Sequence, residues 1–376
     1  MNFIFQISIP IPFEIQTVNI YLIKKEPITL IDTGMKLPET YRYLDNSLKE
    51  AGITWQHIKR VIITHGHVDH FGFGKRIMEL SNPTFFVHKE EYLKIKEGIT
   101  FPKGFAEVLI KNGTPDGMIN KIINYVKKVN QFGDKLDKAR FNILYGGERI
   151  EFDDRFYLKV IHTPGHTPGH ICLYNEKDGI IFSGDHLLQK TTPNPLFDWR
   201  GKEGNQSQHS KVLIDYIRSL RKIEKLDLKI AFPGHGLPFR DIKSLIQKIY
   251  NHHSQRLKNV LNEMDSQKDM TPYQIGCKLF PDMNIKDVLL VVSEILGHLD
   301  ILLDKEMVKR KVTNDRIYYI KEKLPFYKGI FKDIIKSYIE KLTNLIWLYN
   351  SIYPSFFSSN IRISKFFFVF FNLFIP

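Results

Sequence analysis

The chain contains very little cysteine. Only two cysteines occur in 376 residues, Cys172 in an expected strand and Cys277 in an expected helix. Two isolated thiols cannot form the dense disulfide framework that stabilises many small secreted domains, so we expect both to be reduced. A chain of this length can bury a large core instead. These features favour a cytoplasmic protein.

We expect neither a targeting segment nor a membrane-length hydrophobic run in this sequence. The first ten residues carry no basic stretch and end in Pro10, which indicates a first strand rather than a signal peptide. The aromatic run 366–375 has about half of the roughly 20 residues that a membrane span needs. We therefore expect no obligate membrane partner. For the tail 324–376 we consider packing, homodimer formation, disorder or shallow contact with a membrane surface.

No segment concentrates the positive charge. The net charge is +13, of which an excess of seven basic residues lies in 1–240 and an excess of six in 241–376. Because neither part forms an extreme basic patch, the charge gives only weak support to a nucleic-acid partner.

The sequence does contain a dense cluster of metal-binding side chains directly after the apolar run Arg60–Ile63. Gly66 separates two of its histidines, so both imidazoles can point to one side of a tight loop, while the other two residues begin the next expected helix. Imidazole and carboxylate are the usual ligands of zinc and related metals. The cluster therefore predicts a site for two adjacent cations. Its members are His65, His67, Asp69 and His70.

Three further candidate ligands follow in the same setting. His166, Asp185 and His235 each come after an extended apolar run and lie in a glycine-containing turn, as is typical of loops at strand ends. Two divalent cations held roughly 3.5–4 Å apart by a shared carboxylate bind a hydroxide and lower the pKa of water from 15.7 toward about 7. The pattern predicts a catalytic centre rather than a structural metal site.

These motifs resemble the metallo-β-lactamase-fold hydrolases of the glyoxalase II-like branch, whose hallmark T-H-x-H-x-D-H stands at 64–70. Segments 19–23 and 30–34 resemble the family's opening strands, and the resemblance covers about residues 2–240. It implies an α/β fold, a four-layer αβ/βα sandwich, with two divalent metal ions: zinc, or alternatively manganese or iron. The implied ligands are His65, His67 and His166 for one metal, Asp69, His70 and His235 for the other, and Asp185 as the bridge, with Asp69 and Asp185 as catalytic residues.

Other polar residues near these motifs receive supporting roles. His170 and His162 flank His166, and we expect them to support the ligands or to belong to a strand. His186 is either a packing residue or one that meets substrate or orients Asp185. By the same resemblance Asp32 supports the metal loops through hydrogen bonds. We interpret His57, His88 and His209 as surface or packing residues.

Two segments are expected on the substrate side. Residues 89–142 carry apolar positions at helical spacing, including Phe105, Val108 and Leu109, which predicts cap-like helices inserted over the mouth of the site. The proline-containing segment 191–200 follows Asp185 and is expected to be a loop. Its Trp199 and Arg200 either contact substrate or belong to a packed connector.

The catalytic domain is expected at 1–245, a smaller, mostly helical domain at 246–323, and the aromatic helical tail at 324–376. Three helices are predicted in 246–323, one with Thr271 as N-cap and Pro272 at its first position. A hairpin of 308–312 and 317–320 follows. This arrangement resembles the winged-helix module appended to β-lactamase-like hydrolases, where it is often structural or orients substrate.

The first functional hypothesis is metal-dependent hydrolysis of a small-molecule thioester or carboxylic ester. The second is a single-stranded RNA endoribonuclease, since the motif combined with this module resembles the mitochondrial β-lactamase-like ribonuclease. The third is a nucleic-acid-binding regulator whose metal domain senses a ligand; an intact metal site argues against it. A mononuclear iron persulfide dioxygenase also remains open, and the lack of an export signal disfavours antibiotic hydrolysis.

Overall fold

The computed structural model describes residues 2–98, 104–153, 156–195, 211–265 and 267–322. All of them belong to one compact unit, Met1–Ile335, whereas a second unit, Lys336–Pro376, lies wholly outside the described residues. Trp199, Arg200, His209 and the tail 324–376 also fall outside them. Within the described ranges, no helix is both long and apolar enough to cross a membrane.

The first half of the chain forms a six-stranded sheet. Strands one to three pair antiparallel and strands three to six pair parallel. The parallel strands therefore end at the same edge of the sheet. In spatial order the strands are β1 (Ile4–Pro10), β2 (Thr17–Ile23), β3 (Thr29–Ile31), β4 (Arg60–Ile62), β5 (Thr84–His88) and β6 (Arg140–Leu144).

A second sheet has five strands, all antiparallel except for the parallel pair β10–β11. In spatial order the strands are β11 (Ile230–Pro233), β10 (Ile180–Gly184), β9 (Ile171–Asn175), β8 (Phe156–His162) and β7 (Arg149–Asp153).

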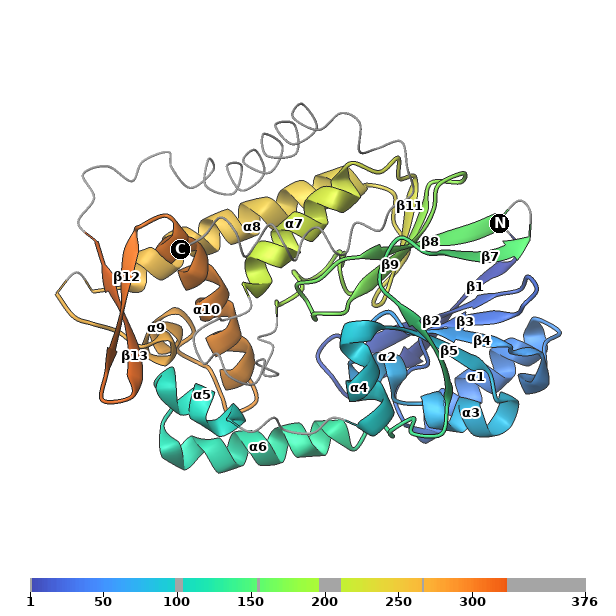
Figure 1. The fold of residues 1–376 in the computed structure, drawn as a ribbon, viewed down its shortest axis with the longest axis horizontal. Helices are drawn as coiled ribbons and strands as arrows, with labels where there is room; N and C mark the ends of the chain where they lie inside the picture. The colour runs from blue at the N-terminus through green and yellow to red at the C-terminus, as the bar shows by residue number, and fades with distance from the viewer. Residues whose placement is uncertain (1, 99–103, 154–155, 196–210, 266, 323–376) are drawn as a thin grey trace, which may run out of the picture. The chain divides into compact units, whose positions relative to one another are not determined.

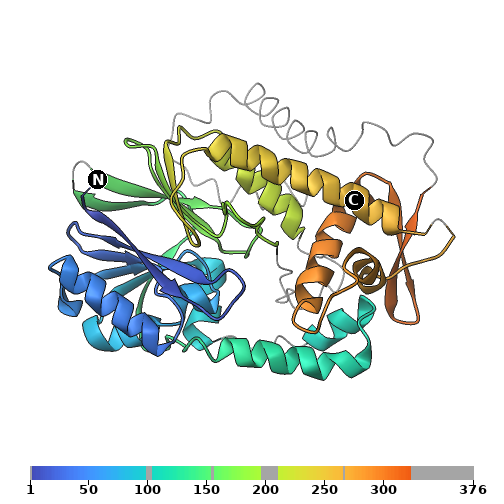
Figure 2. The same cartoon turned by 180° about the vertical axis from the view of Figure 1, so that it is seen from behind.

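The two sheets pack face to face, with helices on the outer side of the first sheet (Figures 1 and 2). Strand β2 illustrates why, because successive side chains of a strand point to opposite faces. Tyr21 and Ile23 enter the core between the sheets, whereas Ile20 and Leu22 enter the core beneath the helices. The predicted α/β sandwich is confirmed. The helices of this part are α1 (Pro38–Glu50), the short 3₁₀ helix η1 (Trp55–His57), α2 (Val68–Phe71), α3 (Gly74–Ser81), α4 (Lys89–Glu97), α5 (Phe105–Lys111), α6 (Asp116–Asn130) and α7 (Val212–Glu224).

The segment 89–142, predicted as a helical insertion, does form helices α4 to α6, but its last residues begin strand β6 of the first sheet. Helices α5 and α6 bury Phe105, Leu109 and Ile122 against Val288 and Val292 of helix α10 (Val288–Asp304). This insertion is therefore attached to the C-terminal helices through an apolar core.

The C-terminal part contains α8 (Ile242–Glu263), α9 (Pro272–Leu279) and α10, followed by a hairpin of β12 (Val308–Thr313) and β13 (Arg316–Lys321). Helix α8 runs continuously across the predicted boundary at 245/246. The predicted cap of α9 is confirmed, since the Gln274 N–H donates to Thr271 Oγ1 at 3.2 Å. The predicted hairpin is also confirmed, with a two-residue turn, Asn314-Asp315, in place of the four residues expected.

A buried carboxylate lies where this hairpin meets the helices. Asp300 of α10 is 6% exposed. Burial raises the pKa of Asp300 from 3.8 to about 7; Asp304 adds to this rise, while Lys211 before α7 and Arg310 of β12 oppose it. Tyr319 of β13 faces the same carboxylate, whose charge adds to the rise that burial causes in the pKa of this phenol. The folded protein therefore binds the Asp300 proton more tightly than the unfolded chain does.

Asp300→Asn is expected to stabilise the protein at pH 8 and to change its stability little at pH 4. In the wild type, the free energy of unfolding falls by about 4 kcal/mol as the pH rises from about 4 to 7. The reason is that the unfolded chain releases the Asp300 proton at a lower pH than the folded protein does. Denaturant unfolding at both pH values measures the difference. Asp282→Asn, which changes an exposed carboxylate in the turn between α9 and α10, is the control and should not produce this gain. An equal gain from Asp300→Asn at both pH values would contradict the assignment.

Candidate metal centre

Loops at the ends of four strands supply the candidate ligands. The loop after β4 leads into α2 and carries the first cluster of ligands, and His166 follows β8. Asp185 follows β10 and His235 follows β11, which run parallel to each other. Because these strands of both sheets end near one another, residues more than 100 positions apart in the chain meet at their ends.

The structure brings all seven predicted ligands together. Three overlapping groups have ligand atoms within 4.8 Å of one another: His65, His67 and His166; His65, His70 and Asp185; and Asp69, His70 and His235. In the first group, His67 Nδ1 lies 2.9 Å from His65 Nε2 and 3.1 Å from His166 Nε2. Three imidazole nitrogens thus converge on one point, as ligands of a small cation do.

Asp185 lies between two ligand sets, one of His65, His67 and His166 and the other of Asp69, His70 and His235. Its Oδ2 is 3.6 Å from His166 Nε2 and 3.3 Å from His235 Nε2. Its Oδ1 is 3.4 Å from His70 Nε2. Asp69 faces the same side, with its Oδ2 at 3.5 Å from His235 Nε2. One carboxylate therefore faces both ligand sets, which is the geometry expected of a bridge.

The outward-facing ring nitrogens of four ligand histidines are fixed by oxygen atoms. His70 Nδ1 lies 2.8 Å from Asp32 Oδ2, and His166 Nδ1 lies 3.1 Å from the Asn194 carbonyl. His65 Nδ1 lies 3.1 Å from a hydroxyl, Thr64 Oγ1, and His235 Nδ1 contacts the carbonyl of Thr17. A ring nitrogen that donates outward leaves the other nitrogen unprotonated and directed inward.

Burial and charge also suit this donor set to divalent cations. Burial lowers the pKa of His65, His67 and His166, so these imidazoles are neutral, the form that binds metal. Burial alone would raise the pKa of Asp185, but nearby His235 and His70 outweigh it and hold that pKa well below its usual range. His70 Nε2 and Asp185 Oδ1 are buried without a hydrogen-bond partner. Such atoms are costly unless something binds them, and a cation between them would do so.

Among the described residues, none of the three candidate groups includes another histidine. His170 Nε2 accepts a hydrogen bond from the Asp185 backbone N–H at 3.1 Å, so His170 orients the bridging residue. His162 and His88 stack on each other, with centroids 4.1 Å apart. His186 is buried beside Tyr216, and burial lowers its pKa to about 3. His57 is exposed on the surface.

Asp32 supports the metal loop, as the resemblance implied. One of its carboxylate oxygens accepts from the Thr64 N–H and the other from Thr64 Oγ1, both at 2.8 Å. The second oxygen also meets His70 Nδ1. A single buried carboxylate therefore fixes both the start of the ligand loop and the ring of one ligand.

Two supporting residues were not anticipated. Glu91 of α4 accepts from the Gly169 N–H at 2.8 Å, and it also lies against Gly66, where an added Cβ would come within 2.4 Å of Glu91 Oε2. It thus braces two ligand loops. Asn194 holds His166, as described above. Glu91 lies in a segment whose pattern predicted only a helix, so nothing marked it as a supporting residue. Asn194 contacts His166 through its backbone carbonyl, which every residue has, so the residue type at 194 did not indicate that contact.

Gly234 explains why the turn before His235 contains glycine. A Cβ at this position would lie 2.3 Å from Asp185 Oδ1 and 2.8 Å from the ring of His70. Any side chain there would displace the bridge, so the turn requires glycine for close approach and not only for flexibility.

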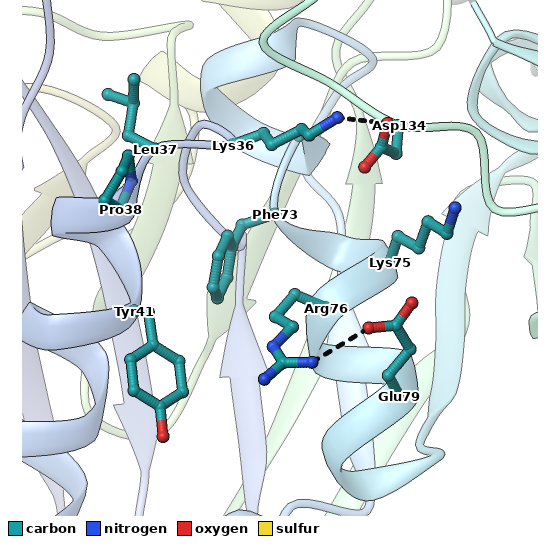
Figure 3. A pocket seen from close by; sticks show the side chains of 10 residues that line it. Lys36, Leu37, Pro38, Tyr41, Phe73, Lys75, Arg76, Glu79 and Asp134 are labelled. Carbon is teal, nitrogen blue, oxygen red and sulfur yellow. Dashed lines mark hydrogen bonds and ion pairs between the residues drawn. The ribbon is translucent and has the colours of Figure 1, made fainter.

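The described part of the chain has a cavity of about 460 Å³ away from this centre (Figure 3). It is lined by residues of α1, α3 and neighbouring loops, and none of the seven candidate ligands lines it. Its charged side chains include the pairs Lys36–Asp134 and Arg76–Glu79, at 2.8 and 3.2 Å. This cavity is therefore distinct from the metal centre.

Comparison with known proteins agrees with the fold. Residues 15–235 match the model of the metallo-beta-lactamase superfamily. A probable metallo-hydrolase of Bacillus subtilis, YqjP, is 32% identical over 83% of this chain and 96% of its own length. A metallo-beta-lactamase family protein from Thermus thermophilus superimposes with a TM-score of 0.72 and 27% identity, over 86% of this chain and 99% of that one.

A more distant relative is the atrochrysone carboxyl ACP thioesterase of Aspergillus fumigatus, 22% identical over 69% of this chain and 47% of its own length. The superfamily match covers more than half of the chain, and the Bacillus relative matches nearly end to end. The chain therefore belongs to the metallo-β-lactamase superfamily and is a metallo-hydrolase.

Proposed function

We propose that this protein hydrolyses a small-molecule thioester or carboxylic ester at a centre of two divalent metals, with zinc as the first choice. His65, His67 and His166 hold one metal, and Asp69, His70 and His235 hold the other. The observation that carries the proposal is the position of Asp185, whose two oxygens lie 3.3–3.9 Å from ligand nitrogens of both sets. The glyoxalase II-like character of the site is part of this proposal.

When bound, the two metals lower the pKa of water and polarise the carbonyl under attack. The protein's residues prepare for that chemistry. Asp185 and Asp69 supply negative charge on the inner side, while Asp32 and three other oxygen atoms hold the outer ring nitrogens of four ligand imidazoles, so that the inner nitrogens face the site. His170 holds the backbone of Asp185 in place.

The thioester choice is supported by two relatives: the Aspergillus protein is named a thioesterase, and the Bacillus protein is named a probable metallo-hydrolase. RNA cleavage is the second candidate. The reason for considering it is the winged-helix-like arrangement of α8 to α10 and the hairpin. Two lysines of this hairpin form ion pairs, Lys309 with Glu322 at 3.0 Å and Lys311 with Asp269 at 2.7 Å. Because paired lysines are less available to phosphates, we place RNA cleavage second.

The test measures thiol release from a panel of acyl thioesters by the zinc-loaded full chain, beside cleavage of single-stranded RNA. We expect thiol release that is absent in Asp185→Ala, which serves as the control for contaminating enzymes. RNA cleavage lost in the same variant, without hydrolysis of any thioester or ester, would replace this proposal with the ribonuclease. Activity equal in wild type and variant would contradict both.

A further inference from the structure

Asn194 joins the candidate metal centre to the C-terminal helices. Its backbone carbonyl lies 3.1 Å from His166 Nδ1, and its side-chain Nδ2 donates to the backbone carbonyl of Leu290 at 3.0 Å. Leu290 lies in the first turn of α10. One residue therefore contacts a candidate ligand with its backbone and a distant helix with its side chain.

The local sequence holds Asn194 rigidly in this position. It stands between Pro193 and Pro195, both of which are buried. Proline fixes its own φ near −65°, and the right-handed helical region is disfavoured for a residue that precedes proline. The Asn194 backbone consequently has few alternative conformations, and its hydrogen bond to the Leu290 carbonyl holds its side chain.

The other end of this connection is also anchored. The first half of α10 buries Val288 and Val292 against Phe105 and Leu109 of α5. The carbonyl of a helical residue has a second lone pair beyond the one used in the helix, so Leu290 can accept from Asn194 without opening α10. The amide orientation is fixed as well, because a carbonyl acceptor requires the Nδ2 side of the amide.

We propose that Asn194 is a positioning residue through which α10 sets the orientation of His166, so that the C-terminal helices contribute to metal binding by the catalytic part. Asn194 acts through His166. The inference builds on the proposed two-metal centre. It predicts that loss of the Asn194 amide weakens the metal held by His65, His67 and His166 and spares the metal held by Asp69, His70 and His235.

The experiment measures zinc affinity of the full-length chain by competition with a chromophoric chelator and records the visible absorption of the cobalt-substituted protein. Asn194→Ala removes the amide, and Asn194→Asp keeps its shape without the donor. In both, we expect one of the two metals to bind about tenfold more weakly, as is usual when support of a ligand histidine is lost, and the cobalt band of that metal to change.

Asn175→Ala is the matched control. Asn175 also donates from its side-chain amide to a backbone carbonyl, that of Tyr157 at 2.8 Å, but it contacts none of the ligands. It should lower the melting temperature without changing metal affinity. The inference is overturned if both Asn194 variants bind two metals as tightly as the wild type, or if they weaken both metals equally. Wild-type stoichiometry tests the two-metal proposal separately: one zinc per chain contradicts that proposal, while the affinity shift of that zinc still decides the role of Asn194.

Discussion

Asp185→Ala is expected to abolish turnover while the protein remains folded. Asp185 is 6% exposed, and its carboxylate lies within 4 Å of ligand nitrogens of both sets, His166 of one and His70 and His235 of the other. Its loss removes the negative charge between four buried imidazoles, so we expect at least one metal to be released and turnover to fall by about a thousandfold or more. Metal content and hydrolysis rate measure the two effects.

The fold should survive this change because the Asp185 side chain contributes no apolar contacts to the cores between and beneath the sheets. His65→Ala should behave in the same way. Glu176→Gln, which removes an exposed carboxylate near the same strands, is the matched control and should keep full activity. Retained turnover in a metal-free preparation of Asp185→Ala would refute the metal-dependent mechanism.

The sequence allowed the candidate ligands to be named because five of the seven stand next to glycine in a turn after an apolar run, and Asp69 and His70 follow in the same motif as His65 and His67. Such a local pattern can be identified even when the order of the strands in the sheets is predicted wrongly. His166, Asp185 and His235 could be named without knowing which sheet carries them, since strand ends gather at one edge in this kind of fold. The cap of α9 and the hairpin were predictable for the same reason: a few adjacent residues determine them.

Contacts between distant backbone atoms could not be predicted in this way. The Thr17 carbonyl that meets His235, and the Leu290 carbonyl that meets Asn194, are groups that every residue carries. Their partners depend on how whole elements pack. The insertion shows the same limit: helical periodicity identified α5 and α6, but nothing local indicated that they would pack on α10, or that residue 140 would begin a strand.

Asp32→Asn is expected to impair the second metal ligand set without a change in side-chain volume. The wild-type carboxylate accepts three hydrogen bonds at 2.8 Å, from the Thr64 N–H, the Thr64 hydroxyl and His70 Nδ1. An asparagine has one oxygen, which the Thr64 N–H requires. Its NH₂ group would then face His70 Nδ1, where two donors cannot meet.

His70 can relieve that conflict by moving its proton to Nε2, the nitrogen that lies 3.4 Å from Asp185. A protonated Nε2 cannot bind a cation, so we expect the affinity for the metal of Asp69, His70 and His235 to fall by about 10- to 100-fold. Activity should fall with it and recover in part at high zinc concentration. Asp45→Asn, which removes a surface carboxylate bonded to Trp55, is the control and should leave metal binding unchanged. If Asp32→Asn lowered the melting temperature of the metal-free protein and yet bound two metals normally, Asp32 would be a purely structural residue, and the tautomer of His70 would have to be fixed by the metal itself.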